Sequence, residues 1–151
     1  AFYSSRLKHQ RPPRGARLAL PRDPANAGRA LELLARDHLI VIARGATTLD
    51  GVTGNPYRFR FALLDNAELV PALDEYDAAF VTAAYALPAS LTTDKVVLVE
   101  DTTCPYANAL VTRPELAQDS RVSALYRLLV SPEVARYELD KWGGLVEPVG
   151  R

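Results

Sequence analysis

A strand-to-helix turn near the start of the chain combines groups that could bind a carboxylate or a phosphate. The apolar residues at 17–20 predict a short strand, and residues 24–37 carry apolar side chains at helical spacing. Asp23 is a favourable N-cap, and the proline after it suits the first helical position. The free N–H groups and positive dipole of the helix start, with the guanidinium of Arg29 one turn later, suit an anion. The alternative is an ordinary turn in which Arg29 is solvated and pairs with Glu32.

The sequence lacks the residues that most enzymatic reactions need. The chain contains two histidines, His9 and His38, and one cysteine, Cys104, so no metal site of the Cys/His type is expected. It contains no G-x-x-x-x-G-K-[ST], G-x-G-x-x-G or G-x-S-x-G motif. An enzyme that uses Cys104 beside His38 stays open as an alternative, and it would need a lowered thiol pKa. We expect the acidic cluster at 74–77 to be a solvated turn.

Basic side chains are concentrated near the N-terminus. Six of them precede the first acidic residue, Asp23, whereas residues 23–151 carry 12 basic and 18 acidic side chains. A basic segment can bind nucleic acid or anionic lipid, but this one has few aromatic residues and no glycine-rich spacing. We therefore expect a solvated connection between strands and no nucleic-acid binding. No apolar run approaches the roughly 18 residues that span a membrane.

The rest of the sequence alternates between strand and helix patterns. Strands are predicted at residues 1–5, 57–61, 77–82, 95–100 and 107–112, and residues 39–42 are either a strand or the exit from the preceding helix. Helices are predicted at residues 47–54, 66–73, 122–129 and 132–142, the last opened by Ser131 and closed by two glycines. This alternation is typical of an α/β fold with a largely parallel sheet.

Five segments resemble, in order and spacing, those of one protein family. Residues 21–31 resemble P-N-D-P-T-N-x-G-R-A-L, the signature of the NlpA family of methionine-binding lipoproteins. Residues 77–87 are similar to the family's D-A-A-V-I-N-T-N-Y-A-L, and residues 104–108 to its S-P-Y-A-N. Residues 131–134 and 142–148 match as well, so the resemblance spans nearly the whole chain.

The resemblance implies a type II periplasmic-binding-protein fold, an α/β fold with a mixed, mostly parallel sheet flanked by helices. Residues 6–104 would form the second lobe. Residues 1–5 and 105–151 would supply the hinge crossings and the C-terminal part of the first lobe, whose N-terminal part is absent. The exposed edge left at residues 1–3 and 110–111 predicts self-association.

The implied function is that of the substrate-binding component of an ABC importer, with a permease as partner and no catalysis, cofactor or metal. The ligand would be methionine or a related amino-acid-like carboxylate. The complete protein would be lipid-anchored, in the periplasm or on the outer face of the bacterial cell membrane. The alternative is a degenerate, non-transporting relative that serves as an interaction or scaffold protein.

The resemblance also implies which residues bind the ligand. Arg29 would bind the carboxylate, with Asn26 shaping the turn. Two family asparagines that hold the ligand's polar head fall at Thr82 and Ala84, which favours a ligand without an ammonium group. The full set of implied ligand-binding residues is Arg29, Asn26, Thr82, Ala84, Tyr85 and Asn108.

Overall fold

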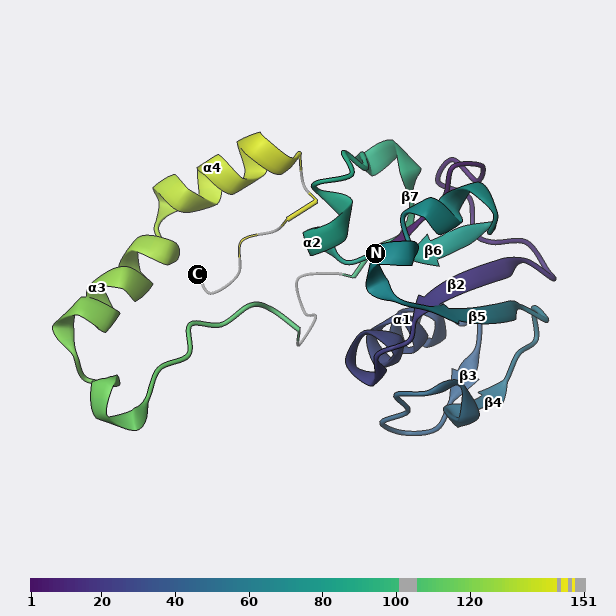
Figure 1. Ribbon diagram of the computed structural model, residues 1–151, viewed down its shortest axis with the longest axis horizontal. Helices are drawn as coiled ribbons and strands as arrows, with labels where there is room; N and C mark the ends of the chain where they lie inside the picture. The colour runs from purple at the N-terminus through teal and green to yellow at the C-terminus, as the bar shows by residue number, and fades with distance from the viewer. Residues whose placement is uncertain (101–105, 144, 147, 149–151) are drawn as a thin grey trace. The chain divides into compact units, whose positions relative to one another are not determined.

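The computed structural model describes residues 1–100, 106–143, 145–146 and 148 (Figure 1). The chain divides into two compact units, Ala1–Glu100 and Asp101–Arg151. The first unit holds the sheet and the turn with which the sequence analysis began. The second unit consists of short helices.

The first unit is built on a five-stranded sheet in the order β5–β2–β6–β1–β7 (Figure 1). The strands are β1 (Phe2–Tyr3), β2 (Arg17–Pro21), β5 (Arg60–Leu64), β6 (Ala78–Phe80) and β7 (Val96–Leu98). β2 is parallel to β5 and β6, and β1 is antiparallel to both β6 and β7. Four strands therefore run in one direction, which confirms the mixed, mostly parallel sheet.

This topology gives the sheet two different ends. The carboxyl ends of the four parallel strands meet at what we call the carboxyl edge: residues 21–29, which include the start of the helix after β2, and residues 64–66, 81–85 and 99–100. Their amino ends meet at the amino edge, which comprises residues 15–17, 58–60 and 75–77 together with residues 4–7, which follow the antiparallel strand β1. In open α/β sheets, ligands bind beyond the carboxyl ends of the strands.

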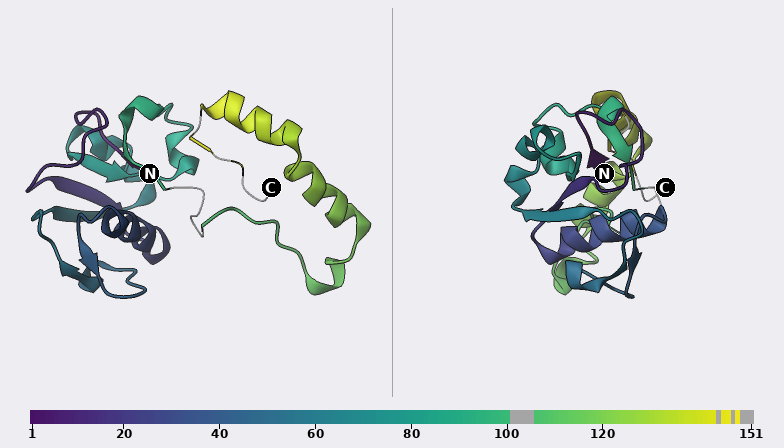
Figure 2. Two further views of the ribbon diagram at one scale, coloured as in Figure 1. Left: turned by 180° about the vertical axis from the view of Figure 1, so that it is seen from behind. Right: turned by 90° about the vertical axis from the view of Figure 1, so that its right-hand side faces the viewer.

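Helix α1 (Pro24–Arg36) lies against one face of the sheet, with the β3–β4 pair beyond it (Figure 2). Its buried face includes Leu31 and Leu34, which join Leu18 and Leu20 of β2 in the core. A Cβ added at Gly28 would lie 3.3 Å from the Thr47 methyl carbon, so this position favours glycine because a loop packs closely there.

Prolines and local polar bonds shift two elements from their predicted positions. The helix predicted at 66–73 is two short 3₁₀ turns, Asn66–Glu68 and Pro71–Asp74, because proline lacks the N–H that a continuous helix needs. The strand predicted at 57–61 begins only at residue 60. Arg58 has φ 55°, and the Asn55 side chain bonds to both the N–H and the carbonyl of Phe59.

The helix predicted at 47–54 is also wrong beyond its first turn. A 3₁₀ turn at Leu49–Gly51 leads directly into strand β4 (Val52–Gly54). β4 pairs antiparallel with β3 (Val41–Ile42) because the chain reverses between them. The remaining short helices of the first unit are α2 (Ala83–Ala86) and a 3₁₀ turn at Thr93–Lys95.

The second unit carries a 3₁₀ turn at Pro114–Leu116 and the helices α3 (Ser120–Leu129) and α4 (Pro132–Trp142). The Ser131 hydroxyl caps α4 and Gly143 ends it with φ 55°, as predicted. The strand predicted at 107–112 is not formed: residues 107–112 have no regular secondary structure and no ladder partner among the described residues. Val111 is 85% exposed there.

The predicted exposed edge at residues 1–3 is wrong for two of its residues. Phe2 is fully buried and Tyr3 is 3% exposed, because β1 lies inside the sheet between β6 and β7. The Phe2 ring packs edge-on against Phe80, with 5.4 Å between ring centres. Burial also raises the pKa of the Tyr3 hydroxyl.

Candidate functional site

Five of the six predicted ligand-binding residues lie at the carboxyl edge. Asn26 and Arg29 lie in the first two turns of α1, immediately after β2. Thr82, Ala84 and Tyr85 follow β6, where Thr82 is the N-cap position of α2. The strand order places the ends of β2 and β6 side by side, so two segments more than 50 residues apart in sequence meet at one edge.

Asp23 joins the helix start to the neighbouring strand ends. Its Oδ1 accepts the backbone N–H of Asn26 at 2.9 Å, which caps α1. Its Oδ2 accepts the side-chain amides of Asn26 at 3.2 Å and of Asn66 at 2.8 Å. Burial opposes ionisation, but the hydrogen bonds from Asn26 and Asn66 outweigh it and hold the pKa of Asp23 below its usual value. Asp23 is therefore a fixed anion at neutral pH.

Arg29 binds a carboxylate of the chain itself. Its Nε donates to Glu100 Oε1 at 2.9 Å and its Nη2 donates to Oε2 at 2.8 Å, which is two-point guanidinium–carboxylate geometry. The two side chains are only 23% and 16% exposed. Nη1 of Arg29 lies 3.4 Å from Asn26 Oδ1, so a polar chain runs from Asp23 through Asn26 and Arg29 to Glu100.

Glu100 is a residue that the sequence analysis did not single out. A signal was present, because Glu100 follows an apolar strand pattern, and carboxyl ends of parallel strands meet at one edge. The alternative pairing of Arg29 with Glu32 was drawn from helical spacing alone. The structure instead adds a partner 71 residues away in sequence.

An open pocket of about 450 Å³ lies at the same edge. It is lined by Arg22, Asp23, Asp65, Asn66, Ala67 and Tyr85. Tyr85 is 41% exposed, and Oδ1 of Asn66 is buried without a hydrogen-bond partner among the described residues. Arg29 does not line this pocket but connects to it through Asn26 and Asp23.

The structure also shows where the remaining predicted residues lie. Thr82 makes no side-chain cap bond to α2, and Ala84 is exposed. Asn108 is exposed and lies in the second unit. Cys104 lies outside the described residues, so the enzymatic alternative built on it stays a hypothesis.

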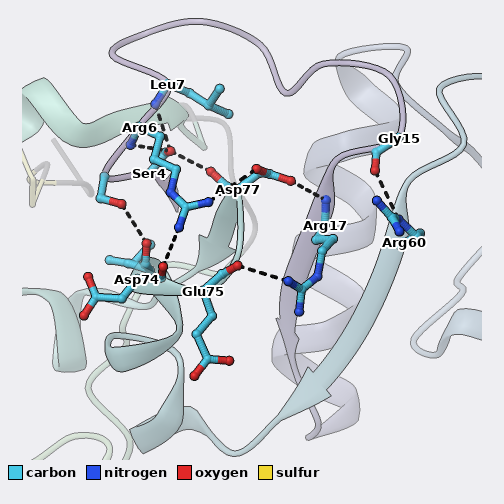
Figure 3. Close-up of polar contacts among 11 residues, drawn as sticks. Ser4, Arg6, Leu7, Gly15, Arg17, Arg60, Asp74, Glu75 and Asp77 are labelled. Carbon is cyan, nitrogen blue, oxygen red and sulfur yellow. Dashed lines mark hydrogen bonds and ion pairs between the residues drawn. The ribbon is translucent and has the colours of Figure 1, made fainter.

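The basic N-terminal segment is an exposed connection between β1 and β2, as predicted, and it also forms hydrogen bonds to the amino edge (Figure 3). The Arg6 guanidinium donates to the Asp74 carbonyl at 2.5 Å, and Arg17 Nη1 donates to the Glu75 carbonyl at 3.3 Å. The acidic cluster is likewise not simply a solvated turn, because Asp77 Oδ2 accepts the backbone N–H of Arg17 at 2.7 Å. These contacts give the basic segment defined hydrogen-bond partners, although few carboxylates lie near it in the sequence.

The comparisons with known proteins decide the family. Residues 1–150 match the sequence model of the NlpA lipoprotein family. The chain belongs to the NlpA lipoprotein family. It is 36% identical over 129 residues to Lipoprotein 28 of Escherichia coli (strain K12), covering 81% of this chain and 47% of that protein. It is 32% identical over 126 residues to the probable D-methionine-binding lipoprotein MetQ of Vibrio cholerae, with the same coverage of 81% and 47%.

Solved structures of NlpA-like proteins share the fold. A nutrient binding protein from Burkholderia cenocepacia bound to methionine is 32% identical with a TM-score of 0.84, covering 99% of this chain and 65% of that one. Lipoprotein Tp32 from Treponema pallidum is 31% identical with the same TM-score of 0.84 and the same coverage of 99% and 65%. The chain thus spans about half the length of the curated relatives that it matches.

These findings confirm the predicted family and fold class, and the family is one of non-enzymatic binding lipoproteins. Relatives are named as membrane lipoproteins, including TpN32 of Treponema pallidum and outer membrane lipoprotein 1 of Mannheimia haemolytica. Within the described part of the chain, no helix has the length and apolar character needed to cross a membrane.

Proposed function

We propose that this chain is the ligand-binding part of a substrate-binding protein that delivers methionine or a related amino-acid-like carboxylate to an ABC importer. One observation carries the proposal: Arg29, at the carboxyl edge of the sheet, holds a carboxylate in two-point geometry. Two solved relatives are named as methionine-bound or methionine-binding, which supports a ligand of that class.

In this proposal the ligand carboxylate binds Arg29 beside Asn26. A guanidinium has five N–H donors, and Glu100 takes one from Nε and one from Nη2. The Nη1 side faces Asn26, which is where we place the ligand carboxylate. Tyr85 is a further proposed contact, Thr82 and Ala84 stand where the family has asparagines, and Asn108 stays a ligand-binding residue predicted from the resemblance.

The predictions of a membrane anchor and a transporter partner concern the complete protein. We propose a lipid anchor on the periplasmic or outer face of the bacterial cell membrane and a permease as partner. The lobe assignment, 6–104 against 1–5 and 105–151, stays a prediction, as does self-association through the exposed residues 110–111. The comparisons do not favour the degenerate scaffold alternative.

The test is titration calorimetry with L-methionine on the protein expressed from its whole gene. Arg29→Ala should weaken binding by roughly 30- to 1000-fold, because it removes the sheltered, charged donor that we place on the ligand carboxylate. Arg60→Ala is the matched control, since Arg60 lies at the amino edge and should leave the affinity unchanged. Equal affinities for the parent and Arg29→Ala would contradict the proposal.

A further inference from the structure

We propose that the amino edge carries a second interaction surface, which binds a membrane that contains anionic phospholipids. The surface is formed by four exposed arginines in two paired segments, which we call the basic cluster: Arg14, Arg17, Arg58 and Arg60. The choice of partner rests on the proposed membrane anchor, but the inference does not depend on the ligand. Because the cluster lies at the opposite end of the sheet from Arg29, membrane binding leaves the proposed ligand site free.

The strand order brings these like charges together. Arg17 and Arg60 are partners in the parallel β2–β5 ladder. Like charges at paired positions of a sheet repel each other, and among the described residues neither arginine forms an ion pair with a carboxylate. Proteins accept such a locally unfavourable pairing mainly where function needs it.

Backbone carbonyls orient three of the four guanidiniums without neutralising them. Each donates an N–H to a carbonyl, at 3.2 Å for Arg14 and at 3.3 Å for Arg17 and Arg60. A carbonyl carries no net charge, and a guanidinium has five N–H donors, so each side chain keeps its positive charge and further donors. Phosphate groups bind oriented guanidiniums of this kind in two-point geometry.

The charge balance also favours an anionic partner. Seven basic and three acidic side chains lie in the amino edge and the connection into it, residues 4–17, 58–60 and 74–77. The remainder of the chain carries 11 basic and 15 acidic side chains. Asp77 offsets part of the local excess, since its Oδ1 lies 3.9 Å from Arg6 Nη1. A basic face on an otherwise acidic chain orients the molecule towards an anionic lipid surface.

The aromatic residues at this edge favour a membrane over a nucleic acid. Proteins that bind single-stranded nucleic acid offer rings on which the bases stack. Here the Arg17 guanidinium lies over the Tyr76 ring at 4.7 Å, and the Tyr57 ring stacks on Phe59 at 5.5 Å. Both tyrosines are half-buried, so the surface offers its cations rather than a stacking platform.

Flotation with lipid vesicles tests the inference on the protein expressed from its whole gene in a form without an acyl group. Vesicles of phosphatidylcholine are compared with vesicles of phosphatidylcholine and phosphatidylglycerol in equal amounts. The protein should bind the anionic vesicles alone, and added salt should weaken the binding because it screens exposed charges.

Two double variants with the same change in net charge locate the surface. Arg17→Gln with Arg60→Gln should weaken binding to the anionic vesicles by about 10- to 30-fold, because two cations near the lipid phosphates are lost. Arg127→Gln with Arg136→Gln, at exposed positions of α3 and α4, is the control and should have little effect. Urea denaturation checks that both double variants are folded.

Three outcomes would overturn the inference. The first needs no variant: the parent protein binds both kinds of vesicle equally, or neither. The second is an equal loss of binding in the two double variants, which would reflect net charge rather than the basic cluster. The third is binding to duplex DNA that anionic vesicles do not displace, which would assign the cluster to nucleic acid. Titration with L-methionine is independent of all three, so the proposed ligand site stands or fails separately.

Discussion

The two ends of the sheet both carry arginines, but they use them differently. At the amino edge, Arg6, Arg17 and Arg60 donate to backbone carbonyls, and Arg6 adds only a long, exposed ion pair of 3.9 Å to Asp77 (Figure 3). At the carboxyl edge, Arg29 bonds to side chains of Glu100 and Asn26. A guanidinium bound to backbone ties the fold together, whereas one bound to a carboxylate can take a ligand carboxylate of the same geometry. The difference separates structural arginines from a candidate binding arginine.

The largest expected effect on stability belongs to the amino edge. Ser4 is 2% exposed, and its hydroxyl accepts the N–H groups of Arg6 and Leu7 and donates to the Asp77 carbonyl at 2.6 Å. Ser4→Ala should lower the free energy of unfolding by about 2–4 kcal/mol, because it leaves these groups without their partner. Urea denaturation measures this, and ligand affinity should not change.

Ser5→Ala is the control for that prediction. The Ser5 hydroxyl donates to the Leu73 carbonyl at 2.7 Å, and the residue is exposed. Its loss should cost no more than about 1 kcal/mol. If Ser4→Ala were no more destabilising than Ser5→Ala, the amino edge would not hold the fold as described.

A smaller, pH-dependent effect is expected at the carboxyl edge. Asp23→Asn keeps a cap for α1 but loses the anion that accepts from the Asn26 and Asn66 amides, so it should cost about 1–2 kcal/mol of unfolding free energy at pH 7. The pKa of Asp23 is lowered by folding, so its contribution is complete above the unfolded value of about 4 and is lost as the pH falls through the folded value.

The measurement is the difference in unfolding free energy between the parent protein and Asp23→Asn, taken from pH 6 to pH 2. The difference should be constant above about pH 4 and shrink below it. A difference that stays constant down to pH 2 would show that the charge of Asp23 does not stabilise this turn.

The smallest effect is expected from Arg60→Ala. The Arg60 side chain is exposed, and its Nε donates to the Gly15 carbonyl at 3.3 Å, a long bond to a group that water can also reach. The loss of unfolding free energy should be at most about 0.5 kcal/mol, measured by urea denaturation. A loss comparable to that of Ser4→Ala would mean that the arginines, rather than Ser4, hold the amino edge.

Local signals explain which parts of the fold were predictable from sequence. α1 was predicted at both ends, because Asp23 and the proline after it act within one turn of the chain. The strand at 107–112 was not, because a strand needs a neighbour, which local apolar pattern does not supply. The hydrogen bonds from Arg6 and Arg17 to the carbonyls at 74 and 75 were also missed, since these partners lie 68 and 58 residues away in sequence.

The candidate site was likewise predictable from the sequence only in part. Arg29 and Asn26 were found because a helix start and a resemblance both point to them. Glu100 was missed because its role depends on the order β2–β6–β1–β7, which brings the ends of α1 and β7 together over a separation of 71 residues. Sequence patterns predict the helices and strands, but the strand order determines which of their ends lie together.

The most direct test of the account follows the arginine side chains themselves. The Nε–H signals of Arg29, Arg17 and Arg60 can be assigned by nuclear magnetic resonance in the protein expressed from its whole gene and followed during titration with L-methionine. The account predicts that the Arg29 signal shifts in a saturable manner while those of Arg17 and Arg60 stay in place. A saturable shift at Arg17 or Arg60 with Arg29 unmoved would contradict it.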